Sequence, residues 1–291
     1  MSSRWTERRQ KFRAVLSGSA CVHPASVHDP ISARIAADLG FETGMFAGSV
    51  ASLTMLGAPD LIVLTLTEFA EQAYRISRAA DLPLMVDADH GYGNALNVMR
   101  TVEELENAGV AGLSIEDTAL PIPFGSSGKS QLISIEEGVG KMQAALAARR
   151  DSDLVIAGRT NAIGITGLAD TLARVKAYAA TGVDAIFLVG VKTPEELEAI
   201  AAEVGLPIIL GGGTGKLADP AFLAPRGVRI CLQGHQPFQA SVRAIHDTLK
   251  ALRDGAAPAA LDGLASGETM GGVTRSSDFE RWMQAFLGTK R

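Results

Sequence analysis

Eight short apolar segments, each followed by a stretch with helical patterning, constrain the fold of this chain more than any other feature. The segments are residues 21–26, 43–49, 83–89, 112–117, 154–160, 185–190, 207–212 and 228–234. After the third, Val98, Val102 and Leu105 recur at helical spacing, with Asn94 expected to cap that helix and Gly109 to end it. Strands that alternate with helices form parallel βαβ units.

Eight such units predict a (β/α)8 barrel of the TIM type, a fold that usually takes about 250 residues. The chain has 291 residues and is 47% hydrophobic, which suffices for a large core. The alternative is a doubly wound open sheet, which the missing GxGxxG signature disfavours. We expect the barrel, as the catalytic domain, to span residues 1–254. Residues 255–291 are expected to form a linker and a helix (277–287) that packs on the barrel or on a neighbouring subunit.

Charge and cysteine content exclude several classes of protein. The net charge is −5, from 27 basic and 32 acidic residues, which argues against a general nucleic-acid binder. The first twenty residues lack the apolar core of a secretory signal, and no apolar run approaches the ~18 residues that span a bilayer. Cys21 and Cys231 form neither a disulfide framework nor a zinc motif. The sequence therefore predicts a cytoplasmic protein without a membrane or nucleic-acid partner.

Ionisable side chains end the third and fourth apolar segments. In the third, Val86 and Ala88 alternate with Asp87 and Asp89. Side chains of a barrel strand point alternately inward and outward, and the outward positions pack against helices. The two aspartates are therefore expected to point inward. The same alternation places Glu116 inward at the end of the fourth segment.

Two later segments repeat this pattern. Arg159 shares the inward face of the fifth segment with Ala157, and Cys231, Gln233 and His235 are expected to share the inward face of the eighth. Carboxyl ends of barrel strands are where barrel enzymes hold their active sites. The ionisable side chains expected to meet at this face are Asp87, Asp89, Glu116, Arg159 and His235.

Three carboxylates converging on one barrel mouth repel each other unless a cation lies among them. Oxygen ligands without cysteine suit Mg²⁺, or Mn²⁺, better than zinc. Arg159 cannot ligate a metal, but its planar fork suits a carboxylate or a phosphate. The predicted ligand is therefore an anion chelated by the metal and held by the arginine.

Structural interpretations of the same residues stay open at this point. Asp87 and Asp89 are also typical of a turn or a helix cap. Glu116 and Arg159 can form a structural ion pair, and His235 can be a structural histidine. The position of these residues at the ends of four separate strands favours a functional site.

Two Gly-containing segments are further candidates for anion binding. The segment "AGSVAS" (47–52) offers small side chains and exposed N–H groups, with Ser49 and Val50 as expected substrate contacts. The segment "GGGTGK" (211–216) resembles a phosphate-binding loop, but Leu217 stands where that motif requires serine or threonine. It is interpreted as a glycine-rich turn after the seventh strand.

The motifs "GSVAS", "VDADHGYGN", "SIEDT" and "GRTNA", in this order and spacing, resemble the isocitrate lyase / phosphoenolpyruvate mutase superfamily. Within it the chain looks most like the oxaloacetate decarboxylase branch. The resemblance implies a barrel whose eighth helix is exchanged between subunits, in a homodimer or homotetramer. It also implies Mg²⁺ and small 2-oxo dicarboxylate substrates.

The resemblance also implies roles for individual residues. By matched position, Asp87 corresponds to the direct metal ligand, while Asp89 and Glu116 correspond to residues that hold metal-bound water. Ser49 and Arg159 correspond to substrate contacts. His235 corresponds to a third substrate contact.

Departures from the superfamily pattern separate its branches. The lyases carry a catalytic cysteine in a loop after the fourth strand, where this chain has "TALPIPFGSSGKSQ" (118–131). The asparagine that the phosphonate-bond enzymes use there is also missing. In the decarboxylase branch a tyrosine is expected after the seventh strand, where this chain has glycines, and an alanine where it has Gly158.

These observations favour Mg²⁺-dependent decarboxylation of oxaloacetate to pyruvate and CO₂ through a metal-stabilised enolate. The alternative is a C–C lyase or hydrolase of the same superfamily that acts on a substituted malate, a methylisocitrate-like compound or an acylpyruvate. A non-catalytic barrel that binds a dicarboxylate is the third hypothesis, because fold alone does not give function.

Overall fold

The computed structural model describes residues 4–126 and 128–288. The chain divides into two compact units, the first ending at His235 and the second beginning at Gln236. This division groups the helix at 236–253 with the C-terminal residues, whereas the sequence placed the boundary after residue 254. Where that helix packs in the assembled protein stays a prediction.

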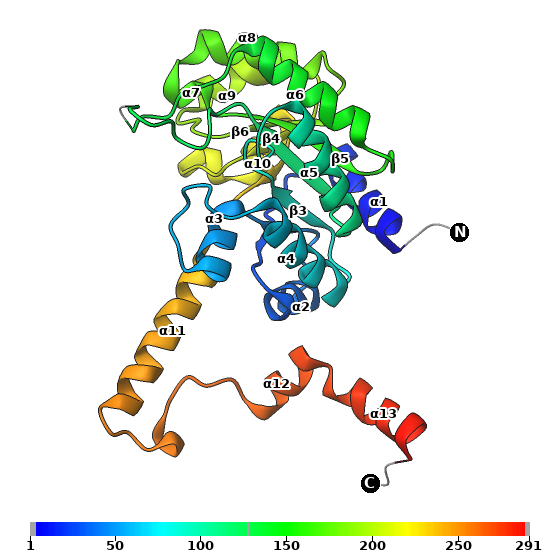
Figure 1. Ribbon diagram of the computed structural model, residues 1–291, viewed down its shortest axis with the longest axis vertical. Helices are drawn as coiled ribbons and strands as arrows, with labels where there is room; N and C mark the ends of the chain where they lie inside the picture. Colours follow the sequence, from blue (N-terminus) through cyan, green and yellow to red (C-terminus); the bar gives the residue numbers. More distant parts are fainter. Residues whose placement is uncertain (1–3, 127, 289–291) are drawn as a thin grey trace. The chain divides into compact units, whose positions relative to one another are not determined.

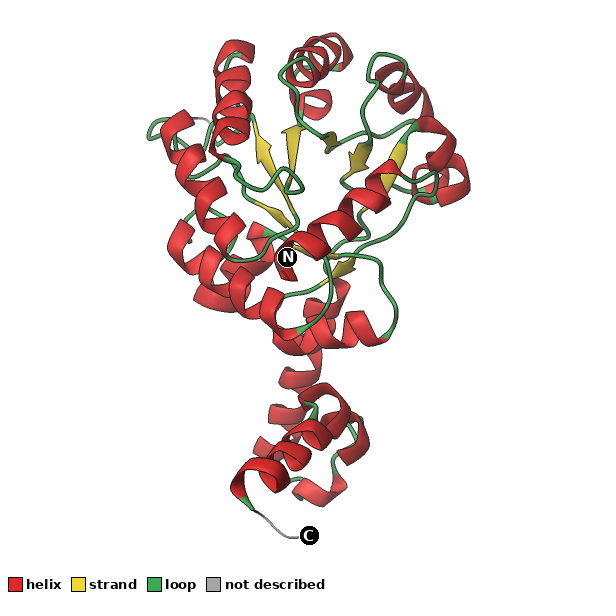
Figure 2. Ribbon diagram, turned by 90° about the vertical axis from the view of Figure 1, so that its right-hand side faces the viewer, coloured by secondary structure: helices red, strands yellow, loops and turns green. Residues whose placement is uncertain are grey.

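The first unit is built on eight parallel strands that follow one another in chain order around the sheet (Figures 1 and 2). The strands are β1 (Ala25–Ser26), β2 (Gly44–Phe46), β3 (Leu84–Asp87), β4 (Gly112–Glu116), β5 (Val155–Thr160), β6 (Ala185–Leu188), β7 (Ile208–Leu210) and β8 (Val228–Cys231). A parallel bridge between Val22 and Ile230 links the last strand back to the chain before β1. The predicted (β/α)8 fold is confirmed, and each strand lies within its predicted segment.

Helices surround the strands of this unit (Figure 2). The α-helices are α1 (Arg4–Ser17), α2 (Pro30–Asp38), α3 (Gly48–Ala51), α4 (Leu66–Ala79), α5 (Ala95–Asn107), α6 (Ile135–Ala148), α7 (Ala162–Ile165), α8 (Leu168–Ala179), α9 (Pro194–Ala201) and α10 (Pro220–Leu223). Short turns of other helix types are η1 (Ser52–Leu56), η2 (Gly215–Ala218) and η3 (Ala224–Arg226). Asn94 caps α5 as predicted, because its side chain accepts from the N–H of Leu96 at 2.9 Å.

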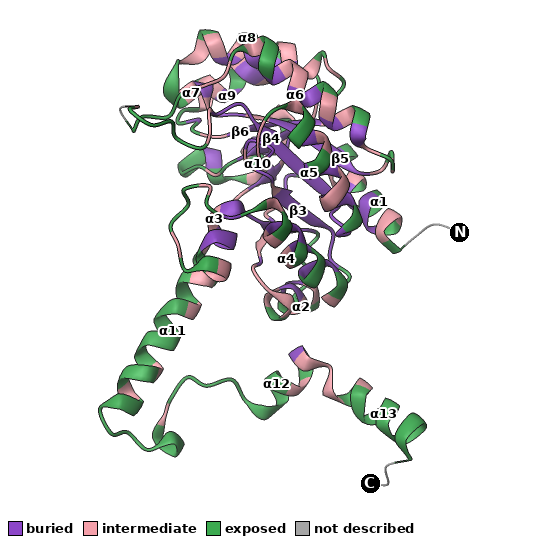
Figure 3. Ribbon diagram, viewed as in Figure 1, coloured by how far each residue is buried: buried purple, intermediate pink, exposed green. Residues whose placement is uncertain are grey.

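Most residues of the strands are buried (Figure 3). On the outward face, Phe46, Val86 and Ile156 are fully buried in the core between the sheet and the helices. On the inward face, Met45 and Phe187 line a cavity instead. The alternation of strand side chains therefore separates a helix-facing core from the barrel interior, as the sequence pattern predicts.

A buried network of charged and hydroxyl side chains is centred on Asp117, the residue that follows β4. Asp117 has no solvent exposure, and its Oδ2 accepts from Tyr178 at 2.8 Å, Thr160 at 2.9 Å and Arg174 at 3.0 Å. Arg174 also donates to the carbonyl of Ile133 at 3.0 Å, near the end of the loop between β4 and α6. The network therefore ties β4, β5 and α8 to the base of that loop.

Replacing Asp117 by alanine should lower the free energy of unfolding by about 3 kcal/mol, because Thr160, Tyr178 and Arg174 lose their shared buried acceptor, while Asp170 still pairs with Arg174 at 2.8 Å. Urea denaturation followed by circular dichroism measures the change. Glu71→Ala, which removes an exposed i,i+4 pair with Arg75, is the control and should change stability by less than about 0.5 kcal/mol. Equal effects of the two substitutions would contradict this account of the network.

The second unit contains α11 (Gln236–Arg253), η4 (Pro258–Ala260), α12 (Gly267–Thr274) and α13 (Ser276–Leu287). The predicted C-terminal helix is confirmed as α13. Large apolar side chains are exposed on α11, including Ile245 and Leu249, and on α13, including Phe279 and Phe286. Among the described residues, no helix combines the length and apolar character needed to cross a membrane.

Candidate active site

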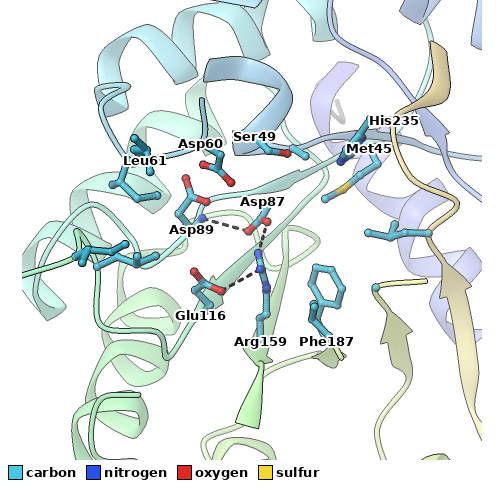
Figure 4. Close-up of a pocket in the computed structure, with 17 residues that line it drawn as sticks. Met45, Ser49, Asp60, Leu61, Asp87, Asp89, Glu116, Arg159, Phe187 and His235 are labelled. Carbon is cyan, nitrogen blue, oxygen red and sulfur yellow. Dashed lines mark hydrogen bonds and ion pairs between the residues drawn. The ribbon is translucent and has the colours of Figure 1, made fainter. Parts of the chain in front are cut away.

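A cavity of about 260 Å³ opens at the carboxyl ends of the strands (Figure 4). Six of the residues predicted from the sequence line it, namely Ser49, Asp87, Asp89, Glu116, Arg159 and His235. The side chain of Val50 is only 1% exposed and is not part of the lining. A contact from Val50 to a ligand is therefore restricted to its backbone N–H group.

Arg159 on β5 lies between two carboxylates, one from the adjacent strand β4 and one from β3 beyond it. Its Nη1 pairs with Asp87 Oδ2, and its Nη2 lies 3.0 Å from Glu116 Oε2. The register of the sheet produces this arrangement, since Glu116 on β4 is the direct partner of Arg159 on β5. The Nε of Arg159 is buried and has no hydrogen-bond partner within the described residues, and the two ion pairs leave further N–H groups of the guanidinium for a ligand.

Asp89 reaches the cavity from a turn that its surroundings fix tightly. Its φ is +49°, a left-handed conformation that is uncommon for a residue other than glycine. The carbonyl of Asp89 accepts from the N–H of Glu116 at 2.8 Å, and the carbonyl of His90 accepts from Nζ of buried Lys141 at 2.9 Å. Gly48 allows the close approach, because a Cβ at this position would lie 2.6 Å from Asp89 Oδ2.

Asp60, in the loop after η1, is a fourth carboxylate that lines the cavity and that sequence reasoning missed. It does not follow a strand, so the strand-end pattern gave no signal for it. The available hint was an acidic residue within the otherwise apolar stretch "GAPDLIV" (57–63). Burial, reinforced by the charge of Asp87, raises the pKa of Asp60 above its usual range.

The acidic cluster carries more negative charge than Arg159, the one cation in its described lining, can neutralise. Burial raises the pKa of Asp89 well above its usual range, and the charges of Asp87 and Glu116 add to this effect. Burial also raises the pKa of Glu116 to about 7, although Arg159 opposes the shift. The pKa of Arg159 itself rises, because the nearby carboxylates outweigh the opposing effect of its burial. The site therefore favours an additional cation.

The donor set fits a hard divalent cation that keeps part of its water shell. Within residues 4–126 and 128–288, no three His, Cys, Asp or Glu side chains are grouped as a ready metal-binding set. Mg²⁺ is commonly bound through one or two carboxylates and several waters, so it does not need such a set. Asp87 and Glu116 are engaged by Arg159, which supplies the positive charge nearest to them.

His235 reaches the cavity by a different route from the one expected. The side chain of Cys231 lies in the core between the sheet and the helices, with its Sγ 3.6 Å from the carbonyl of Leu217. The prediction that Cys231 and His235 share the inward face of a strand is therefore wrong. The strand ends at Cys231, and the chain then turns through Gly234, with φ +88°, to bring His235 to the cavity.

An apolar wall faces the acidic cluster across the cavity. The side chain of Phe187 lies beside Arg159, whose guanidinium carbon is 5.4 Å from the centre of the ring. Figure 4 shows Phe187, Met45 and His235 on the side away from Asp89 and Glu116. Apolar residues are not confined to that side, because Figure 4 shows Leu61 beside Asp60. The other apolar lining residues are Ala47, Ile62, Leu120, Ile122, Val189 and Leu232.

The glycine-rich segment after β7 borders the cavity through Gly211. A Cβ at this position would lie 2.8 Å from Cγ2 of Val189, so the close packing of β6 and β7 requires glycine. No side chain therefore enters the cavity from this position. The tyrosine expected in the decarboxylase branch is therefore not replaced by another side chain at Gly211.

The two cysteines do not provide a nucleophile or an acid for the cavity. Both are buried free thiols, and neither belongs to the described lining. Burial raises the pKa of Cys21 to about 12 and that of Cys231 to about 11. Neither thiol can therefore replace the loop cysteine on which the lyases of the superfamily depend.

Comparisons with known proteins agree with the motifs. The family model of phosphoenolpyruvate phosphomutase matches residues 12–253. A protein of Bradyrhizobium diazoefficiens named oxaloacetate decarboxylase is 60% identical over 284 residues, which cover 98% of each chain.

Two solved structures have the same fold as this chain. Oxaloacetate acetylhydrolase in complex with 3,3-difluorooxalacetate has a TM-score of 0.85 at 27% identity and covers 98% of both chains. Phosphonopyruvate hydrolase in complex with oxalate and Mg²⁺ has a TM-score of 0.83 at 28% identity and covers 96% of this chain and 99% of that one. With the family model matching most of its length, the chain belongs to the phosphoenolpyruvate phosphomutase family of enzymes.

Proposed function

We propose that the protein decarboxylates oxaloacetate to pyruvate and CO₂ with the help of Mg²⁺. The observation that carries the proposal is a cavity with an acidic cluster and Arg159 at one side and an apolar wall at the other. The 60% identity to a protein named oxaloacetate decarboxylase supports the same substrate.

The polar side of the cavity would bind the 2-oxo acid end of the substrate. Asp87 would hold the cation directly, and Asp89 and Glu116 would hold it through water molecules. When bound, the cation supplies Lewis-acid stabilisation of negative charge that develops at the C2 oxygen. Arg159 would fix the C1 carboxylate through guanidinium N–H groups that its two ion pairs leave unused, and fixed orientation lowers the barrier to reaction.

The apolar side would hold the carboxylate that leaves. The C3–C4 bond breaks, its electron pair becomes the C2–C3 double bond of an enolate, and C4 departs as neutral CO₂. A proton from solvent then adds at C3 and gives pyruvate. A charged carboxylate becomes an uncharged molecule in this step, so surroundings such as Met45, Phe187 and Leu232 favour the product over the reactant. The N–H groups at Ser49 and Val50 and the imidazole of His235 are the polar groups assigned to the substrate on this side.

Pyruvate formation from oxaloacetate by the purified protein tests the proposal. The rate with Mg²⁺ should greatly exceed the rate of the same buffer with metal alone, and EDTA should abolish the difference. Free metal ions decarboxylate oxaloacetate slowly, so the metal-only control decides the result. A rate equal to this background would refute the proposal.

The glycine-rich segment after β7 contributes no side chain to the cavity at Gly211, where a tyrosine is expected in the decarboxylase branch, and this favours a second candidate, a lyase or hydrolase that acts on a different 2-oxo or 2-hydroxy acid. Analysis of products separates the two reactions. Cleavage of the C2–C3 bond of oxaloacetate by water yields oxalate and acetate, whereas decarboxylation yields pyruvate. Turnover of a substituted malate without turnover of oxaloacetate would favour this candidate.

Mg²⁺ should bind more weakly as pH falls through about 7. The pKa of Glu116 is about 7 without a cation, and that of Asp89 is also raised, so binding must displace protons below this pH. Each displaced proton weakens binding by roughly tenfold per pH unit. The metal-free protein should lose stability as pH rises from 4.5 to about 7, because the folded state keeps protons that the unfolded state releases.

Titration calorimetry between pH 8 and pH 6, in two buffers of different ionisation enthalpy, measures both the affinity and the protons released. Glu116→Gln is the matched variant, since it cannot release a proton at this position. It should show a shallower dependence on pH than the unmodified protein. An affinity for Mg²⁺ that does not change over this range would contradict the prediction.

The apolar faces of α11 and α13 support a proposal about assembly. We propose that the protein is a homodimer or homotetramer in which these helices cover apolar surface between subunits. Light scattering coupled to size-exclusion chromatography tests it. A monomer at micromolar concentration would contradict the proposal.

A further inference from the structure

The barrel closes where the chain around β1 meets β8, and this junction is called the seam. Two side-chain contacts join its sides in addition to backbone hydrogen bonds. In the described part of the chain, the backbone bonds across the seam join Val22 to Arg229 and Cys231. Nearer the cavity, Nδ1 of His23 lies 2.8 Å from the carbonyl of Cys231. Nδ1 of His235 lies 2.9 Å from Oγ of Ser26.

These two contacts constrain their histidines differently. A carbonyl oxygen can only accept a hydrogen bond, so Nδ1 of His23 must carry a proton. A hydroxyl can donate or accept, so Ser26 permits either tautomer of His235. Ser26 Oγ has no other hydrogen-bond partner within the described residues, and its proton is therefore free to point at Nδ1. Burial lowers the pKa of His235, although the charge of Asp87 opposes this, so burial favours the neutral form of the ring.

The groups that line the cavity favour one of the two tautomers of His235. Asp60, Asp87, Asp89 and Glu116 already line it as acceptors. An anionic ligand needs donors, and a bare Nε2 on His235 would add one more acceptor. If Ser26 donates to Nδ1, the proton of the neutral ring resides on Nε2, which has no partner within the described residues. The imidazole then offers the ligand an uncharged N–H group.

We propose that Ser26 is a positioning residue that donates to Nδ1 of His235 and so keeps a proton on its Nε2 for the ligand. The identity of this ligand as a 2-oxo dicarboxylate rests on the proposed function. Ser26 is placed for this task by β1, where it pairs with Met45 of β2, and it touches the ligand only through His235. The role therefore concerns the tautomer and orientation of the ring and not contact with the reacting atoms.

The tautomer can be measured without turnover. Long-range ¹H–¹⁵N correlation spectra of the full-length Mg²⁺-loaded protein distinguish a protonated from a bare ring nitrogen, and His235→Gln assigns the signals among five histidines. The unmodified protein should have a bare Nδ1 and a protonated Nε2 at His235. Ser26→Ala should yield a mixture of tautomers. A protonated Nδ1 in the unmodified protein would overturn the proposal.

Kinetics provide the second measurement. Ser26→Ala should lower kcat/KM for oxaloacetate by on the order of tenfold, as expected for one lost hydrogen bond to the ring. Ser26→Thr keeps the hydroxyl, and a 60 Å³ side pocket lined by Ser26 and His235 leaves room for its methyl group, so it should restore both the tautomer and the rate. In the His235→Gln background, where an amide N–H replaces Nε2–H, Ser26→Ala should cause no further loss.

His23→Ala is the matched control, because it weakens the same seam without touching His235. It should lower the melting temperature and leave the tautomer unchanged. If Ser26→Ala, like His23→Ala, lowers the melting temperature and leaves the tautomer of His235 unchanged, the contact is only structural and the proposal fails. If the unmodified protein does not decarboxylate oxaloacetate but Ser26→Ala still shifts the tautomer, the proposed function fails and the role of Ser26 stands.

Discussion

Replacing Asp87 by alanine is expected to lower kcat/KM for oxaloacetate by on the order of 10³-fold. Lewis-acid stabilisation of developing charge supplies several kcal/mol, and each 1.36 kcal/mol corresponds to about tenfold in rate. Asp87 is the carboxylate expected to bind the cation directly, and it also pairs with Arg159. The substitution therefore removes the side chain expected to bind the metal, and it also removes the ion-pair partner that helps to hold Arg159 in place.

Steady-state kinetics with saturating Mg²⁺, together with calorimetric titration of Mg²⁺, check this result. Asp87→Asn keeps the size and one oxygen but not the charge, so it should bind Mg²⁺ more weakly than the unmodified protein and still fold. Asp262→Ala, at an exposed position in the second unit, is the control and should retain full activity. Full metal-dependent activity in Asp87→Ala would remove the basis of the proposed mechanism.

Replacing Arg159 by methionine is expected to lower kcat/KM by roughly 10²-fold, because misplacement of a substrate has effects of this size. The substitution has a second consequence in the metal-free protein. Arg159 is the one cation of the described cavity lining, and without it the buried Glu116 and the partly buried Asp87 are left without a positive charge between them. The metal-free variant should therefore lose about 3–5 kcal/mol of stability.

Thermal unfolding with EDTA and with Mg²⁺ separates the two consequences. Mg²⁺ should raise the melting temperature of Arg159→Met more than that of the unmodified protein, since the cation replaces the missing positive charge. Arg159→Lys keeps a charge but not the planar fork, so it should recover stability more than activity. Equal stabilisation of Arg159→Met and the unmodified protein by Mg²⁺ would argue that the arginine and the cation do not share the same carboxylates.

The sequence predicted the positions of all eight strands, because buried parallel strands are short, apolar and separated by helical patterns. It also predicted that Asp87, Asp89, Glu116 and Arg159 meet in one cavity. That prediction needed only the alternation of side chains and the rule that the carboxyl ends of barrel strands share one face. Both are local or topological regularities, which a single sequence records directly.

Other features depend on how the chain turns after a strand ends. Asp60 enters the cavity from a loop, and no periodicity in the sequence encodes the path of a loop. His235 was predicted correctly to line the cavity but for a wrong reason, since Cys231 packs outward and a turn at Gly234 redirects the chain. Val50, two residues into a short helix, has its side chain buried instead of exposed to the cavity.

By itself the sequence determined the barrel, the acidic cluster and the superfamily resemblance, because periodicity, strand parity and motif order follow from covalent neighbours. Only the tertiary structure decided which side chains share hydrogen bonds across the sheet, such as Arg159 with Asp87 and Ser26 with His235. These pairs are 72 and 209 residues apart in the chain. Their contacts depend on register, closure of the barrel and turns of a few residues, which no local pattern specifies.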